Sequence, residues 1–261
     1  MNEVPPIIPA NAHYHVSNIL LLGGTGTALT LAQELSQQGY QLTYSIAGLV
    51  RQPDLPCQVI SGGFTQFGGM AQFVRSQRIS LIIDATHPYA VQISHSAATT
   101  ASECGIPCWR LQRPCWEQQT GDNWQTFQDW ETLTGHLMAY RRVFLSHGQL
   151  SRQQLEILSR IRTSDQQFII RTAAPIALNL PEWIQPLAAI GPFDFQDELA
   201  LLQGLAIEAI VSKNSGGSAT YGKIQAAREL RVPVLMLQRP ELPVVTQEFF
   251  SREELFVKLQ T

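Results

Sequence analysis

The chain has 261 residues, of which 44% are hydrophobic and 15% are charged, and its formal net charge is −3. This composition is typical of a folded globular protein and excludes a disordered chain. The mildly acidic balance argues against a nucleic-acid partner, so an anionic ligand would need a local cluster of cations.

The N-terminal segment 1–17 contains prolines and lacks the pattern of a secretory signal, so we expect a flexible tail. No apolar run reaches the roughly 18 residues that cross a bilayer, so no membrane partner is expected. Three of the four cysteines, Cys104, Cys108 and Cys115, lie close together, but they lack a second pair or a nearby histidine at ligand spacing. We expect reduced thiols, no metal and a cytoplasmic protein.

The first half of the chain alternates short apolar runs with segments of helical periodicity. The predicted strands are 18–22, 41–47, 58–61, 80–85 and 107–111, and the predicted helices are 27–38, 67–77 and 91–104. Such alternation is typical of a parallel sheet whose strands are joined by right-handed helical crossovers.

The stretch 113–135 interrupts this pattern with Pro114, several tryptophans and many glutamines, and it reads as a linker or domain junction. The alternation then resumes, with strands predicted at 142–146, 167–171, 187–190, 209–211 and 232–237, and helices at 149–160, 195–204, 221–230 and 252–260. No internal repeat is evident. We predict an α/β protein with two Rossmann-like parallel-sheet domains, 18–138 and 139–261, and an interdomain cleft.

A glycine-rich turn joins the first predicted strand to the first helix. It consists of Gly23, Gly24, Thr25, Gly26 and Thr27. Glycine allows a tight turn and close approach of a diphosphate, to which the helix N-terminus offers unpaired N–H groups. The match to G-x-G-x-x-G is incomplete, because Leu29 occupies the third glycine position. A turn used only for packing is the alternative.

The end of the second predicted strand carries no acidic residue, whereas enzymes that prefer NAD usually place one there to hold the ribose hydroxyls. Arg51 follows instead, and its guanidinium could pair with the 2′-phosphate of NADPH. This feature favours NADPH as the cofactor, with an ordinary surface arginine as the alternative.

The fourth strand is followed by a polar cluster, 84–90, at a strand end where open parallel sheets bind ligands. Thr86 is a candidate cofactor ligand, while His87, Pro88 and Tyr89 are candidate substrate ligands. Helix capping by Asp84 and Thr86 is the alternative, although capping requires neither the histidine nor the tyrosine.

A second cluster follows the strand predicted at 209–211. It combines a cation, an amide, a hydroxyl and two glycines, in Lys213, Asn214, Ser215, Gly216 and Gly217. This combination is typical of an anion-binding loop, with incidental polarity as the alternative. Three further candidate substrate ligands lie near predicted strand ends or just downstream of this loop: Arg113, Tyr221 and Lys223.

Together these motifs resemble the precorrin-6A reductase family of the cobalamin pathway. The matching stretches are LLLGGTG (20–26), GGF (62–64), DATHPYA (84–90), LQRPCW (111–116), GPFDFQDELALL (191–202), VSKNSGG (211–217), YGKIQAAREL (221–230) and VPVLMLQRP (232–240). The chain departs from the family at Thr27, where an acidic residue is common, and at 145–148, where a Thr-Thr-Gly-like segment is replaced by Leu-Ser-His-Gly.

The resemblance implies NADPH-dependent reduction of one double bond of precorrin-6A, or of cobalt-precorrin-6A, to the 6B form. The first domain would bind NADPH and the second the substrate, whose carboxylates would meet cations such as Lys213 and Arg171. His87 or Lys213 could supply the proton, as could water or a macrocycle nitrogen. A short-chain dehydrogenase is a weaker alternative, because Tyr221-x-Lys223 lacks that class's Tyr-x-x-x-Lys spacing, and a dinucleotide-sensing regulator is a third.

Overall fold

The computed structural model describes residues 16–48 and 52–261. Contacts divide the chain into two compact units. Unit 1 comprises the described residues up to Arg113 together with Pro240–Thr261, and unit 2 is Pro114–Arg239. The chain therefore passes from unit 1 to unit 2 and back again.

Unit 1 is built on a six-stranded parallel sheet with the order β12-β5-β4-β1-β2-β3. Its strands are β1 (Asn18–Leu22), β2 (Gln41–Ile46), β3 (Gln58–Ser61), β4 (Leu81–Asp84), β5 (Cys108–Leu111) and β12 (Gln247–Phe249). Its helices are α1 (Gly26–Gln37), the 3-10 turn η1 (Thr65–Phe67), α2 (Met70–Ser76), α3 (Val91–Cys104) and α8 (Arg252–Leu259).

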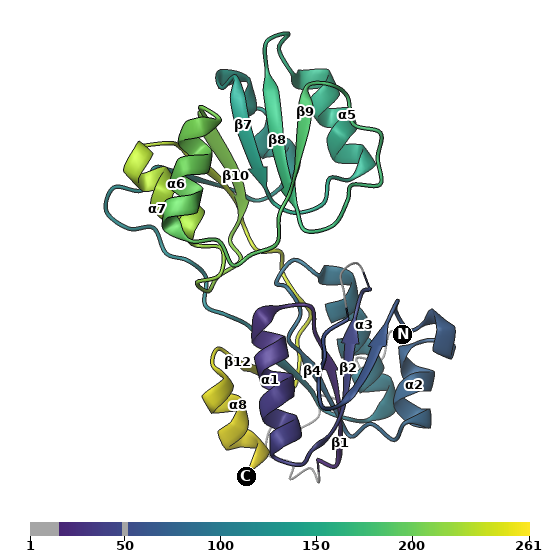
Figure 1. Ribbon diagram of the computed structural model, residues 1–261. Coiled ribbons are helices and arrows are strands. Elements are labelled where there is room, and N and C mark those ends of the chain that lie inside the picture. The colour runs from purple at the N-terminus through teal and green to yellow at the C-terminus, as the bar shows by residue number, and fades with distance from the viewer. Residues whose placement is uncertain (1–15, 49–51) are drawn as a thin grey trace. The chain divides into compact units, whose positions relative to one another are not determined.

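Helices cover both faces of this sheet, with α1 and α8 on one side and α2 and α3 on the other (Figure 1). Successive side chains of β1 point to opposite faces, so Leu21 packs with the α1 layer and Leu20 with the α2 layer. This explains why the central strand is apolar without alternation, since both of its faces are buried.

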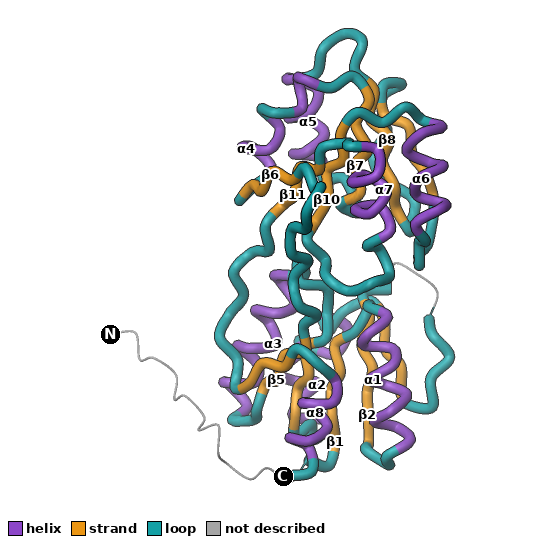
Figure 2. The backbone as a smooth tube through the Cα atoms, turned by 90° about the vertical axis from the view of Figure 1, so that its left-hand side faces the viewer, coloured by secondary structure: helices purple, strands orange, loops and turns teal. Residues whose placement is uncertain are grey.

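Unit 2 has the same strand order, β6-β11-β10-β7-β8-β9, and its strand pairs are also parallel. Its strands are β6 (Trp124–Phe127), β7 (Arg142–Ser146), β8 (Gln167–Thr172), β9 (Ile184–Ala188), β10 (Ala209–Lys213) and β11 (Val234–Leu237). Its helices are α4 (Trp130–Thr134), η2 (Leu137–Ala139), α5 (Arg152–Ile161), α6 (Phe195–Gly204) and α7 (Gly222–Leu230). Figure 2 shows α4 and α5 on one face of the sheet and α6 and α7 on the other.

Each sheet has one edge strand, β6 or β12, that pairs with a strand distant in the sequence. β6 follows β5 in sequence but pairs with β11, while β12 follows β11 but pairs with β5. Both crossings carry the sequence Leu-Gln-Arg-Pro, at 111–114 and 237–240. The backbone N–H of Gln112 donates to the carbonyl of Phe249 at 2.9 Å, and that of Gln238 donates to Phe127 at 2.8 Å. The two junctions therefore repeat one local structure.

The structure confirms an α/β protein with two parallel sheets and corrects several details. The predicted boundary at 138/139 differs from the unit division, because 114–138 belongs to unit 2 and 240–261 to unit 1. Strands β6 and β12 were not predicted. α2 begins at Met70, later than predicted, because Gly68 and Gly69 have positive φ angles. The strand predicted at 187–190 is β9, which begins earlier at Ile184.

The predicted N-terminal tail falls largely on residues 1–15, which lie outside the described residues. Among the helices of the described ranges, none combines the length and the apolar character needed to cross a membrane.

Candidate functional site

The glycine turn after β1 owes its shape to Tyr44 of β2. A Cβ atom on Gly23 would lie 2.2 Å from the Tyr44 ring, so no other residue fits there without movement. The next residue, Gly24, has a φ angle of +101° and donates its N–H to the Tyr44 hydroxyl at 2.9 Å. Burial raises the pKa of Tyr44, which keeps this hydroxyl neutral. The first two glycines are therefore both required by the local geometry.

Thr25 caps α1 and links the turn to the segment after β4. Its hydroxyl accepts the N–H of Ala28 at 3.1 Å and donates to the carbonyl of Ala85 at 3.0 Å. Gly26 and Thr27 form the first turn of α1, where backbone N–H groups have no partner within the helix. The sequence prediction of a strand, a tight turn and a helix N-terminus is confirmed as structure.

The segment after β4 begins at a buried carboxylate. Asp84 is 2% exposed, and its Oδ1 accepts the N–H of Thr86 at 3.2 Å and the Thr86 hydroxyl at 2.6 Å. This pattern is a local turn, and the capping alternative is wrong, because α3 begins at Val91 with Ala90 as its N-cap and without a side-chain cap hydrogen bond. The turn fixes where Thr86 lies. β1 and β4 are neighbours in the sheet, while β2 lies on the far side of β1, so strand order reverses here. Open α/β sheets bind their ligands at such a reversal.

His87 is half-buried, and the structure fixes its tautomer. Its Nδ1 accepts the N–H of Tyr89 at 3.3 Å, so in the neutral ring the hydrogen is on Nε2. The rings of His87 and Tyr89 lie 5.5 Å apart, and Pro88 between them is buried. Because its Nδ1 is already used as an acceptor, the neutral imidazole is suited to donate a hydrogen bond through Nε2.

Behind this segment lies an ion-pair network that the sequence analysis missed. Arg110 of β5 is 1% exposed and contacts Asp84 Oδ2 through Nε at 3.4 Å. Its Nη1 bonds Glu248 of β12 at 2.6 Å, and its Nη2 bonds the carbonyl of Pro243 at 2.9 Å. An arginine inside the otherwise apolar strand Cys-Trp-Arg-Leu was the available signal.

Arg51, the residue expected to read the 2′-phosphate, lies outside the described residues, so its role stays a prediction. The described residues around it at the ends of β2 and β3 include no carboxylate from Ser45 to Gly48 or from Ser61 to Gly63. The side chain of Gln52 donates to the Ser61 hydroxyl at 2.8 Å.

In unit 2, the loop after β10 turns at two successive glycines. Gly216 and Gly217 have φ angles of +67° and +72°, which favour glycine, and the N–H groups of such a turn are available to build an anion site. Lys213 and Ser215 are half-buried beside them, and burial lowers the pKa of Lys213. These features fit the predicted anion-binding loop.

Asn214, by contrast, is used to build the loop. Its Oδ1 accepts the N–H of Trp116 at 2.8 Å, and its Nδ2 donates to the Trp116 carbonyl at 3.0 Å. The indole Nε1 of Trp116 donates to the carbonyl of Gly217 at 2.7 Å, and Arg239 donates to the carbonyl of Asn214 at 2.8 Å. The predicted ligand role of Asn214 therefore remains a prediction, with a structural role beside it.

Lys223 is buried at 3% exposure, where its ammonium donates to the carbonyl of Thr220 at 2.9 Å. Its pKa is lowered to about 7, chiefly by burial and also by the charge of Arg171, while Glu198 acts in the opposite direction. Arg171 and Glu198 form a buried ion pair next to it. Lys223 and Arg171 thus form a charged layer beneath the strand ends.

The two remaining candidates are Tyr221 and Arg113. The Tyr221 hydroxyl accepts from Arg228 at 3.0 Å. Arg113 is half-buried just after β5, in unit 1. Their roles as substrate ligands stay predictions.

His147 follows β7, at the position that Gly23 has after β1. It is 3% exposed and stacks on Trp130 with ring centroids 4.7 Å apart. Neither imidazole nitrogen has a hydrogen-bond partner among the described residues. Burial lowers the pKa of His147 to about 3, and the charge of Lys213 acts in the same direction while Gln154 opposes it. His147 is therefore neutral at physiological pH.

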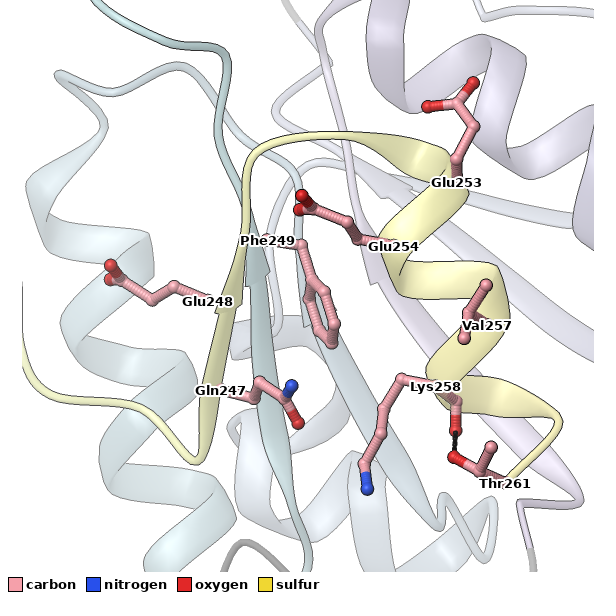
Figure 3. A pocket seen from close by; sticks show the side chains of 8 residues that line it. All are labelled: Gln247, Glu248, Phe249, Glu253, Glu254, Val257, Lys258 and Thr261. Atoms are coloured by element: carbon pink, nitrogen blue, oxygen red, sulfur yellow. Dashed lines mark hydrogen bonds between the residues drawn. The ribbon is translucent and has the colours of Figure 1, made fainter.

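A groove of about 570 Å³ lies on unit 1 between β12 and α8 (Figure 3). It is lined by Gln247, Glu248, Phe249, Glu253, Glu254, Val257, Lys258 and Thr261. It contains none of the predicted site residues, so the candidate site is defined by strand-end geometry.

Comparison with known proteins matches residues 18–260 to the family model described as "Precorrin-6x reductase CbiJ/CobK". A precorrin-6A reductase from Sinorhizobium sp is 40% identical over 226 residues, which cover 85% of this chain and 84% of the relative. One from Rhodococcus erythropolis is 40% identical over 235 residues, covering 89% and 93%. A solved structure, "CobK precorrin-6A reductase", superposes with a TM-score of 0.84 at 32% identity and covers 94% of this chain and 96% of that one.

Proposed function

The chain belongs to the precorrin-6x reductase family, and we propose that it reduces one double bond of precorrin-6A with NADPH as the hydride donor. The observation that carries this proposal is the pairing of the glycine turn with the segment after β4, joined by the hydrogen bond from Thr25 to Ala85. A nicotinamide cofactor is implied by the family, and NADPH is the form that we propose.

The turn of unit 1 suits the diphosphate of such a cofactor. A Cβ atom built on Gly24 or Gly26 would meet nothing within 4 Å, so the space above the turn is open to a ligand. The N-terminus of α1 offers N–H groups and a partial positive charge to a diphosphate. Gly23 to Thr27 would hold it, with Arg51 on the ribose phosphate and Thr86 on the nicotinamide side of the reversal point.

The loop after β10 is our proposed recognition site for the carboxylates of the macrocycle. The N–H groups of the Gly216–Gly217 turn and the ammonium of Lys213 would bind an anion. An arriving carboxylate also favours the charged form of Lys213, whose pKa is lowered by burial. His147 near Lys213 is neutral at physiological pH and adds no charge to the loop.

When bound, the nicotinamide supplies a hydride to one carbon of the double bond, and the electron pair of that bond then takes a proton at the neighbouring atom. We assign this proton to Lys213, because burial lowers its pKa and so offsets part of the rise that a bound carboxylate causes. His87 is assigned to orientation, because a neutral ring that accepts at Nδ1 would have to become an imidazolate to release its Nε2 proton.

The test is to supply purified protein with metal-free precorrin-6A and NADPH and to follow the loss of nicotinamide absorbance. Precorrin-6A is the first substrate because the relatives described above bear that name. Parallel reactions with NADH and with cobalt-precorrin-6A measure cofactor and metal preference. We expect stoichiometric NADPH oxidation and formation of the 6B product; no oxidation with either macrocycle would refute the proposal.

A further inference from the structure

Arg110 is an unusual residue for the centre of a sheet. Its side chain is fully buried on β5, and each of its three nitrogens has an acceptor, on Asp84, Glu248 and Pro243. Burying a guanidinium costs several kcal/mol per ion unless it is paired, and a well-packed apolar residue often gives equal or better stability. A role other than stability therefore accounts better for this network.

Asp84 connects Arg110 to the proposed site. One carboxylate oxygen of Asp84 contacts Arg110, while the other accepts both the backbone N–H and the hydroxyl of Thr86. The guanidinium thus fixes the rotation of the carboxylate, and the carboxylate fixes the first polar residue after β4. Without Arg110, Asp84 would be a buried, uncompensated charge that must rotate, take up water or become protonated.

Glu248 reaches this network from the far end of the chain. Glu248 is among the residues that line the groove, and Figure 3 shows its side chain on the other side of β12 from Phe249. Its side chain is 51% exposed, so its ion pair with Arg110 adds little stability by itself. It does hold one arm of the guanidinium, leaving Nε directed at Asp84.

We propose that Arg110 and Glu248 are positioning residues that set the geometry of the Thr86–Tyr89 segment through Asp84. This inference rests on the proposed function, in which that segment lies beside the reacting ring of the cofactor. Hydride transfer depends on alignment, and a displacement of about 1 Å can cost about a hundredfold in rate. Through Glu248, the edge strand β12 thereby adjusts a segment that begins at Thr86, far away in the sequence.

The first test is Glu248→Gln, with Glu253→Gln as the matched control because it removes the same charge from a nearby exposed position. We expect Glu248→Gln to lower kcat about fivefold while leaving the NADPH dissociation constant within about twofold, the behaviour of lost alignment. The melting temperature should not change. Unchanged kcat, or the same loss in Glu253→Gln, would overturn the proposal.

A double-mutant cycle with Asp84→Asn separates a relay from two independent effects. Glu248 and Asp84 interact through Arg110, so Glu248→Gln should have almost no further effect on kcat in the Asp84→Asn background. Equal fold-losses in both backgrounds would overturn the relay. Arg110→Lys keeps the charge but loses the fork that contacts three acceptors, and it should resemble Glu248→Gln rather than wild type.

Amide exchange tests the relay without any substrate. The N–H of Thr86 is bonded to Asp84, so it should exchange faster in Glu248→Gln and Arg110→Lys than in wild type or Glu253→Gln. Unchanged exchange in both would overturn the positioning role. If wild-type protein fails to oxidise NADPH with precorrin-6A, the proposed function fails, whereas the exchange result still decides the relay.

Discussion

The two units share one strand order but differ at the turn that follows their central strand. In unit 1, Gly23 begins the turn, and the N-cap Thr25 lies three residues after the strand end at Leu22. In unit 2, His147 fills the first position, stacked on an aromatic ring, and the N-cap Ser151 lies five residues after Ser146. The same topology therefore leaves room for the proposed diphosphate site only where glycine begins the turn.

The segments after the neighbouring strands differ in how they are held. After β4, Asp84 and a buried arginine fix the chain through charge. After β10, Asn214 and Trp116 hold the loop through neutral hydrogen bonds, and two cations, Lys213 and Arg239, lie at it. This contrast suits a cofactor side that needs alignment and a substrate side that needs positive charge.

The largest expected effect comes from Gly23→Ala. The new Cβ would collide with Tyr44, so we expect a loss of about 1–3 kcal/mol in unfolding free energy, as for an overpacked core, and loss of measurable NADPH binding. Calorimetric titration and thermal unfolding measure both quantities. The control is Gly148→Ala in unit 2, where the Cβ would meet nothing within 4 Å and only the φ angle of +96° opposes it, at about 1–2 kcal/mol. Equal losses of NADPH affinity would contradict the comparison.

Lys213→Ala tests the loop after β10, which we propose to bind the substrate. Removing a charged hydrogen bond of about 1.5–3 kcal/mol should raise KM for precorrin-6A about 10-fold to 150-fold, with NADPH affinity unchanged. Lys213→Arg keeps the charge but is a much weaker acid, so KM should recover while kcat falls about a hundredfold or more. An unchanged KM in Lys213→Ala removes the residue from the substrate site. Full kcat in Lys213→Arg assigns the proton to another source.

Arg51→Ala tests whether the proposed cofactor site prefers NADPH to NADH. We expect NADPH affinity to fall about tenfold or more, because a charge-assisted hydrogen bond to the 2′-phosphate is lost, while NADH affinity stays the same. Fluorescence titration with both nucleotides measures this ratio. A parallel loss for NADH and NADPH means that Arg51 does not read the phosphate.

The smallest effect at neutral pH is expected for His147→Phe, which keeps an aromatic ring against Trp130. Between pH 6.5 and about 3 the unfolded chain takes up a proton that the folded chain excludes, so wild-type stability falls as pH decreases through this window. The slope from this one residue is at most about 1.4 kcal/mol per pH unit. Urea unfolding at several pH values should show a shallower decline in the variant. Identical slopes would mean that His147 is not buried as a neutral ring.

The apolar strands and the glycine turn were predictable because their signals are local. The run Ile19 to Leu22 is buried on both faces, and Gly23 to Gly26 stand directly between a strand and a helix. The polar segment 84–90 was also found, since it follows such a strand. The sequence therefore indicated which residues lie at the strand ends within each unit.

The edge strands could not be predicted because their signal is not local. β6 and β12 are short and largely exposed, each with only its terminal Phe buried, and their partners lie far away in sequence. The predicted domain boundary differs from the unit division for the same reason, because the tryptophan-rich stretch that was interpreted as a linker contains β6 and α4. The link from Arg110 to Glu248 depends on that exchange, so the network behind Asp84 was hidden as well.

The exchanged edge strands also make the two units unequal in how they depend on the chain. Unit 2 is one continuous stretch, 114–239, and contains all the strands of its own sheet. Unit 1 is discontinuous, because β12 lies beyond unit 2 in the sequence and brings Glu248 to Arg110. Cutting the chain after Arg239 would therefore leave unit 2 whole, but would remove from unit 1 both an edge strand and one partner of its buried arginine.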